Sequence, residues 1–294
     1  AGVIVPNVLL IVRLDSNFLK NWKVRQMAVS GVCTAFWSVL LMLLNSMAYL
    51  VLCLNNSGSM TILQGRLFKM KVLLLNPPFL KKFSRPQRSP AVTKSGTLYF
   101  PMWLAYATGV LEKEGFDVDL IDAPADDYDL DYCLERIRRF NPNLIVLDTS
   151  TPSIYNDVEI AGKLKDELPE VFVVLVGTHV SALPEETLKM DKRINAVAQY
   201  EYEWTLLDIA RTLAKKGDLK SVLGLIFRDN DRFIHNPARP YIKDLDELPF
   251  VSTVYKKFLK IENYFNPNAL YPMVTITTSR GCPFKCTFCV YPQV

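Results

Sequence analysis

From Met70 onward the sequence alternates short apolar runs with amphipathic segments, and this alternation restricts the fold more than any other feature. The apolar runs fall at residues 72–75, 116–121, 144–147, 171–176 and 196–198. The segments with helical spacing of apolar residues fall at 103–114, 128–140, 157–168, 185–190 and 205–216. Strands that alternate with helices predict βαβ units. We therefore expect an α/β domain over residues 70–217, a doubly wound sheet of five parallel strands.

Residues 218–270 carry a different pattern. Short apolar runs at 224–228 and 232–235 flank the turn sequence Asp-Asn-Asp, which indicates a β-hairpin. Several prolines and mixed aromatics follow, so we expect a linker with one helix near residues 254–264. Alternating β-branched residues at 273–277 then predict a new strand, which leads directly into a group of cysteines.

Residues 1–69 read as a hydrophobic N-terminal extension. Residues 34–54 contain no charged side chain and are about long enough to span a bilayer as a helix. Basic residues lie on both sides of this run, so the loop charges favour neither orientation. Met70 opens a segment typical of the natural start of an α/β domain. Two hypotheses therefore stand side by side: a membrane anchor, or a mis-assigned start with the native chain beginning at Met70.

The charged residues do not point to a nucleic-acid partner. The 294-residue chain has 34 basic and 30 acidic residues and a net charge of +4, a balance too even for a nucleic-acid-binding surface. We therefore expect no nucleic acid among its partners.

The six cysteines are unevenly spread, and three of them, Cys282, Cys286 and Cys289, lie together near the C-terminus. Three cysteines at such tight spacing are poorly suited to disulfides among themselves. A reduced, cytoplasmic protein with a metal site fits this pattern better. Three thiolates on one loop can hold three irons of a [4Fe–4S] cluster and leave the fourth iron open to a cofactor. The alternative is zinc, which usually takes four ligands, and no fourth cysteine or histidine lies nearby.

The Cys-x3-Cys-x2-Cys spacing, with Phe288 just before the last cysteine, resembles the radical S-adenosylmethionine (SAM) superfamily. The resemblance implies that Cys282, Cys286 and Cys289 ligate the cluster and that Phe288 lies beside SAM. It further implies that the reduced cluster cleaves SAM to a 5′-deoxyadenosyl radical. Residues 271–294 would then be the start of a radical SAM (β/α) barrel. Because a barrel needs on the order of 200 residues beyond this loop, we expect a truncated, inactive fragment of a longer enzyme.

Residues 71–250 resemble the cobalamin (B12)-binding domain of the radical SAM enzymes that use this vitamin. The matching segments include Leu-Asn-Pro-Pro at 75–78, Thr-Ser-Thr-Pro-Ser at 149–153 and Val-Gly-Thr-His at 176–179. Where the family has Gly-Glu-Gly-Glu-x-Thr, residues 200–205 are Tyr-Glu-Tyr-Glu-Trp-Thr. This sequence therefore keeps the two acidic residues and the threonine but neither glycine. The cofactor-binding residues that the resemblance implies are Asn76, Pro77, Thr149, Ser150, Thr151, Ser153, Gly177, Thr178, His179, Glu201, Glu203, Thr205 and Phe288.

The loop at residues 122–127 lacks the histidine of the Asp-x-His-x-x-Gly loop of methionine-synthase-type cobalamin domains. It therefore offers no imidazole to cobalt, and His179 is the one histidine in the ligand-side loops. We expect bound cobalamin to be base-off, with its lower cobalt face free of nitrogen. The resemblance implies that His179 lies near the nucleotide tail of cobalamin, and the alternative is a hydrogen bond that orders its own loop.

Together these resemblances imply a cobalamin-dependent radical SAM enzyme, most similar to the hopanoid and anaerobic-cyclase branch. Its cofactors would be a [4Fe–4S] cluster, SAM and cobalamin, and its reaction a methyl transfer, rearrangement or cyclisation at an unactivated carbon. We expect a small-molecule or lipid substrate and an electron donor such as flavodoxin or ferredoxin. Membrane association through residues 34–54 stays open. The alternatives are a cobalamin-binding module, or a domain that only docks a barrel, without catalysis.

Overall fold

The computed structural model describes residues 10–11, 49–54, 60–65, 70–86, 95–282, 284 and 286–287. The chain divides into two compact units, Ala1–Lys69 and Met70–Val294. In the first unit, β1 (Leu10–Ile11), β2 (Tyr49–Leu54) and β3 (Met60–Gly65) pair antiparallel in that order.

The predicted membrane span at residues 34–54 is described only at its end. Residues 34–48 lie outside the described residues, and residues 49–54 form strand β2 instead of the end of a helix. Within the described part of the chain, no helix has the length and apolar character needed to cross a membrane.

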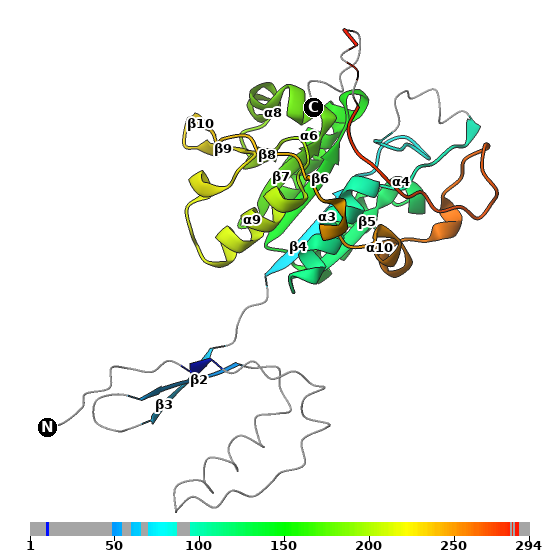
Figure 1. The fold of residues 1–294 in the computed structure, drawn as a ribbon. Helices are drawn as coiled ribbons and strands as arrows, with labels where there is room; N and C mark the ends of the chain where they lie inside the picture. The colour runs from blue at the N-terminus through cyan, green and yellow to red at the C-terminus, as the bar shows by residue number, and fades with distance from the viewer. Residues whose placement is uncertain are drawn as a thin grey trace, which may run out of the picture. The chain divides into compact units, whose positions relative to one another are not determined.

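The second unit is built on a seven-stranded sheet, shown in Figure 1, with the order β10-β9-β8-β7-β6-β4-β5. Its five parallel strands are β4 (Lys71–Asn76), β5 (Asp117–Asp122), β6 (Leu144–Thr149), β7 (Phe172–Gly177) and β8 (Ala196–Ala198). The predicted doubly wound α/β fold is therefore confirmed. Strand β4 lies between β5 and β6, so the sheet grows first to one side of β4 and then to the other. At such a switch in strand order a ligand crevice forms outside the carboxyl ends of the strands.

The predicted hairpin is present and belongs to the same sheet. Strands β9 (Leu225–Asp229) and β10 (Arg232–His235) pair antiparallel, and β9 also pairs antiparallel with β8. The sheet thus has two strands more than the sequence predicted. The hairpin covers the edge of the three-residue strand β8 that β7 leaves open.

Helices cover both faces of the sheet. One face carries α3 (Met102–Lys113), α9 (Glu203–Ala214) and α10 (Val251–Phe258). The other carries α5 (Leu130–Phe140), α6 (Ile154–Glu167) and α8 (Pro184–Met190). Successive residues of one strand, such as Leu73 and Leu74, pack into opposite layers. This two-sided burial explains why the strands read as continuous apolar runs in the sequence.

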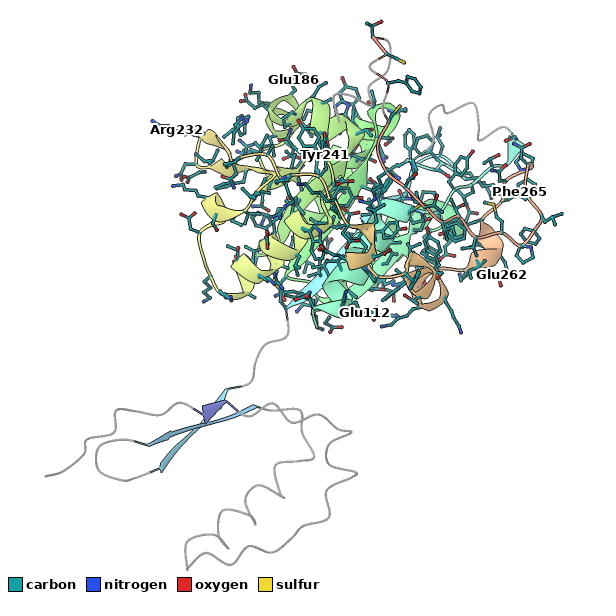
Figure 2. All side chains as sticks on the ribbon, in the orientation of Figure 1. Glu112, Glu186, Arg232, Tyr241, Glu262 and Phe265 are labelled. Atoms are coloured by element: carbon teal, nitrogen blue, oxygen red, sulfur yellow. The ribbon has the colours of Figure 1, made fainter. Side chains whose placement is uncertain are left out.

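Short helical turns connect these elements. Helix α4 (Ala123–Asp126) follows β5, and α7 (Thr178–Ala182) follows β7. The 3-10 turns are η2 (Thr151–Ser153), η3 (Leu219–Ser221), η4 (Leu245–Glu247) and η5 (Ile261–Asn263). After α10 and η5, Phe265, labelled in Figure 2, pairs through its backbone with Leu98.

Two predictions for the linker region need correction. The helix expected near residues 254–264 is α10 (Val251–Phe258), followed by the separate turn η5. The strand expected at 273–277 is wrong, because this described segment belongs to no strand. Its β-branched residues favour an extended backbone, but a strand also needs a hydrogen-bonded neighbour, and Ile276 is 64% exposed.

Candidate functional site

A cavity of about 480 Å³ opens at the carboxyl edge of the sheet. Its walls come from residues 78–81 after β4, from Ala123 and Pro124 of α4, and from the first turns of α6. These elements follow β4, β5 and β6, the strands on either side of the switch in strand order. The structure therefore places a concave surface where a doubly wound sheet binds its ligands.

Asn76 and Asp122, the last residues of β4 and β5, form a buried polar pair at this edge. The amide of Asn76 donates to Asp122 Oδ1 at 2.6 Å, and the hydroxyl of Tyr264 donates to Asp122 Oδ2 at 2.8 Å. Burial raises the pKa of Asp122 to about 6, although both hydrogen bonds lower it. Tyr264 comes from the segment after α10, so that segment completes the edge of the α/β domain.

Arg85 fixes the loop after β4 against α6. Its guanidinium donates to the side-chain oxygen of Asn76, to the carbonyl of Pro77 at 2.8 Å, and to Asp157 at 2.5 Å. Both members of the Arg85–Asp157 pair are buried, with side chains 1% and 0% exposed. Ser153 donates to the same carboxylate at 2.6 Å. The loops after β4 and β6 are thus held together by one buried, hydrogen-bonded ion pair.

Asp148, near the end of β6, adds a further buried carboxyl group. It accepts a hydrogen bond from the backbone N–H of Thr149 at 3.0 Å and is 8% exposed. Burial raises its pKa to about 7; Arg85 opposes this rise, and the nearby Asp157 and Asp122 add to it. Sequence reasoning missed Asp148, although a carboxylate at the end of a buried parallel strand is a recognisable signal for a ligand-side residue.

The loops after β6 and β7 approach each other closely. The hydroxyl of Thr149 donates to the carbonyl of Val176 at 2.7 Å, and Ser150 and Ser153 share a hydrogen bond of 2.8 Å. Gly177 has φ of +117°, and a Cβ there would overlap the backbone oxygen of Thr149. Only glycine therefore allows the two strand ends to meet in this way.

His179 stands in α7 directly after this glycine. Its Nδ1 lies 3.2 Å from the hydroxyl of Thr151, while its buried Nε2 has no hydrogen-bond partner within the described residues. Burial lowers the pKa of His179, which favours the neutral imidazole at pH 7. Thr151 and Thr178 beside it are exposed. A buried ring nitrogen without a partner, next to a close glycine and exposed hydroxyls, fits a bulky polar ligand such as cobalamin at this edge.

The residues predicted after β8 have protein partners. Glu203 accepts from Arg280 Nη2 at 2.6 Å, and Glu201 accepts from Arg280 Nη1 at 3.4 Å. The hydroxyl of Thr205 donates to the carbonyl of Leu223 at 3.0 Å and accepts from Arg239 at 2.9 Å. Contacts of these three residues with a cofactor stay predictions.

Cys282 and Cys286 are the described members of the cysteine group, and both are exposed. Cys289 and Phe288 lie outside the described residues. In the part of the chain that the structure describes, no three metal-binding side chains converge. Exposed thiolates suit an iron–sulfur cluster by their donor chemistry.

Residues 88–209 match the family described as "B12 binding domain". The chain is 33% identical over 220 residues to an uncharacterised methyltransferase of Pyrococcus horikoshii, covering 75% of this chain and 45% of that protein. It is 28% identical over 194 residues to the anaerobic magnesium-protoporphyrin IX monomethyl ester cyclase of Cereibacter sphaeroides, covering 64% and 31%. The chain thus spans less than half the length of these relatives.

A solved structure of OxsB has a similar fold. OxsB is a cobalamin-dependent S-adenosylmethionine radical enzyme, solved with aqua-cobalamin and S-adenosylmethionine bound. The TM-score is 0.50 at 18% identity, over 60% of this chain and 23% of that one. This likeness supports the α/β fold, and the family match confirms the B12-binding domain predicted from the sequence.

Proposed function

We propose that this chain, whose residues 88–209 match the B12-binding-domain family, is part of a cobalamin-dependent radical SAM enzyme and takes part in a methyl transfer or cyclisation at an unactivated carbon. The substrate is a small molecule or a lipid, and a flavodoxin or ferredoxin supplies electrons. Because the chain covers less than half of its relatives, this activity is proposed for a protein of the relatives' length. The chain by itself is proposed to be inactive.

The carboxyl edge of the sheet would hold the cobalamin, which supplies a cobalt centre able to carry a methyl group. Gly177 lets the ends of β6 and β7 approach without a side chain between them. His179 offers a polar group of the ligand its Nε2, which has no partner within the described residues. The exposed hydroxyls of Thr151 and Thr178 lie in the same loops. Arg85 holds the loop after β4 in place through its hydrogen bonds to Pro77 and Asp157.

The cysteine loop would hold a [4Fe–4S] cluster, which supplies the electron that cleaves SAM. Cys282, Cys286 and Cys289 each contribute one thiolate, so one iron stays open for SAM. The observation that carries the proposal is the order of the two parts: the B12-binding-domain match at residues 88–209 is followed, after the hairpin and linker, by three cysteines at this spacing.

The test is turnover with SAM that carries a deuterated methyl group, using protein of the relatives' length, reconstituted anaerobically with iron, sulfide and cobalamin. Methyl transfer predicts 5′-deoxyadenosine together with deuterium in the product. Cyclisation predicts 5′-deoxyadenosine and an unlabelled product. Stoichiometric zinc, without labile sulfide and without SAM cleavage, would contradict the proposal and leave the domain a binding or docking module.

A further inference from the structure

Arg280 precedes the cysteine group by two positions, and its side chain is buried in the α/β domain. The side chain is only 8% exposed, and its partner Glu203 is 2% exposed. Arg280 Nη2 donates to Glu203 Oε1 at 2.6 Å, and Nη1 donates to Glu201 Oε1 at 3.4 Å. The pair thus joins the cysteine segment to the first turn of α9.

Helix α3 encloses the same guanidinium with two aromatic rings. Its central carbon lies 4.8 Å from the ring centroid of Trp103 and 5.0 Å from that of Tyr106. A guanidinium between aromatic faces and carboxylates has one preferred position, because its plane and its fork of donors must both be satisfied. Arg280 is therefore held by two helices at once.

Several described residues on either side of Arg280 lie at the surface. Ile276 is 64% exposed and Phe284 is 70% exposed. Cys282 and Cys286 are exposed as well. Among the described residues from 278 onward, Arg280 is the one that is not exposed.

The partners of Arg280 stand at the ligand edge of the sheet. Glu201 and Glu203 follow β8 at its carboxyl end, and the intervening Tyr202 is buried with its hydroxyl unpartnered within the described residues. Asp148 lies near the carboxyl end of β6, which runs parallel to β7, as β7 does to β8. The residues that hold Arg280 and the sheet edge proposed to bind cobalamin therefore lie on the same side of the domain.

We propose that Arg280 is a positioning residue that fixes the cysteine loop on the α/β domain and so sets the distance between the cluster and cobalamin. This inference rests on the proposed function, which places a cluster on the loop and cobalamin at the edge. Lysine cannot replace Arg280 fully, because a single ammonium group cannot pair with two carboxylates and stack on two rings with the same geometry.

The test uses the full-length holoprotein and measures the magnetic interaction between the reduced cluster and Co(II) by electron paramagnetic resonance. The wild type should give one narrow distribution of distances between the cluster and Co(II). Arg280→Met should broaden this distribution while iron and cobalamin contents stay at wild-type levels, and Arg280→Lys should give an intermediate width.

The transfer of the methyl group per 5′-deoxyadenosine formed should fall roughly tenfold or more in Arg280→Met, since misplacement of about 1 Å can cost this much. Arg138→Met, which breaks the exposed pair with Glu167, is the matched control and should behave as wild type.

Glu203→Gln leaves the sequence of the cysteine loop unchanged and weakens the same ion pair at the partner of Arg280. It should broaden the distribution of distances between the cluster and Co(II) in the same way. A wild-type distribution in Arg280→Met or in Glu203→Gln, with both cofactors bound, would overturn the positioning role. Loss of cobalamin alone from Glu203→Gln would also overturn it and make Glu203 a cobalamin contact. If Arg280→Met loses its iron, the distance distribution of Glu203→Gln alone decides whether the positioning role holds. Absence of a cluster or of cobalamin from the wild type would instead contradict the proposed function.

Discussion

The carboxyl edge of the sheet and the cysteine loop differ in burial and in where their functional groups come from in the chain. At the edge, Asn76, Asp122 and Asp157 are buried and hydrogen-bonded to partners from distant parts of the chain. In the cysteine loop, Cys282 and Cys286 are exposed. The first site is made by the fold, and the second by three donor atoms close together in sequence.

This difference has a physical consequence. Where packing and backbone conformation make a site, a substitution acts by straining or destabilising the domain. Where exposed donor atoms make a site, a substitution removes a ligand and leaves the stability of the domain nearly unchanged.

Cys286→Ala should abolish formation of an intact cluster, because the loop then offers two thiolates in place of three. The free energy of unfolding should change by no more than about 0.5 kcal/mol, as expected for an exposed position. Iron and sulfide analysis, together with urea unfolding, checks both statements. Affinity for cobalamin should equal that of the wild type. A cluster retained in this variant would contradict the assignment of the ligands.

Gly177→Ala should lower the free energy of unfolding by about 2–4 kcal/mol, from left-handed backbone strain and overlap with Thr149. The matched control is Gly115→Ala, since Gly115 also has positive φ (+88°) but its Cβ would meet nothing within 4 Å. The control should lose only about 1–2 kcal/mol, from backbone strain alone. Equal losses in the two variants, measured by urea unfolding, would show that close approach at the strand ends is unimportant.

Asp148→Asn should stabilise the cofactor-free protein at pH 8. The pKa of Asp148 is about 7 in the folded protein against an ordinary 3.8, so the folded state holds the proton more tightly than the unfolded state. The contribution of Asp148 to stability therefore falls as pH rises from about 4 through 7, by up to roughly 4 kcal/mol. We expect a gain of about 2–4 kcal/mol for the variant at pH 8 and little difference near pH 4. A gain independent of pH would contradict this account.

His179→Ala should weaken cobalamin binding by roughly tenfold, about the worth of one hydrogen bond to the ligand. Iron content should be unaffected. The Co(II) spectrum of the wild type should show no splitting by an axial nitrogen, as expected for base-off cobalamin. A threefold splitting of each cobalt line that disappears in His179→Ala would mean that His179 ligates cobalt.

The sequence predicted the parallel strands well, because their two-sided burial leaves apolar runs that are visible without any tertiary information. The loops that carry the predicted cofactor-binding residues follow the carboxyl ends of β4, β6, β7 and β8 in the structure, while their contacts with a cofactor stay predictions. Position along the chain does not reveal which distant groups meet there. Arg85 contacts Asp157, and Tyr264 contacts Asp122, across separations of 72 and 142 residues.

The sequence was misleading where local propensity competes with pairing. Residues 273–277 have the composition of a strand, but propensity alone cannot supply a hydrogen-bonded neighbour. Arg280 lies two positions before Cys282, yet only the fold shows that its charge is buried against Glu203. Buried ion pairs of this kind join segments that no short-range pattern connects.

We propose that one chain carries both a cobalamin site at the sheet edge and an iron–sulfur cluster on the cysteine loop. The cobalt and iron contents of the protein after anaerobic reconstitution with both cofactors, and removal of excess, test this directly. We expect about one cobalamin and about four irons per chain, with about four sulfides. Four irons without cobalt would contradict the role of the sheet edge, and cobalt without iron would contradict that of the cysteine loop.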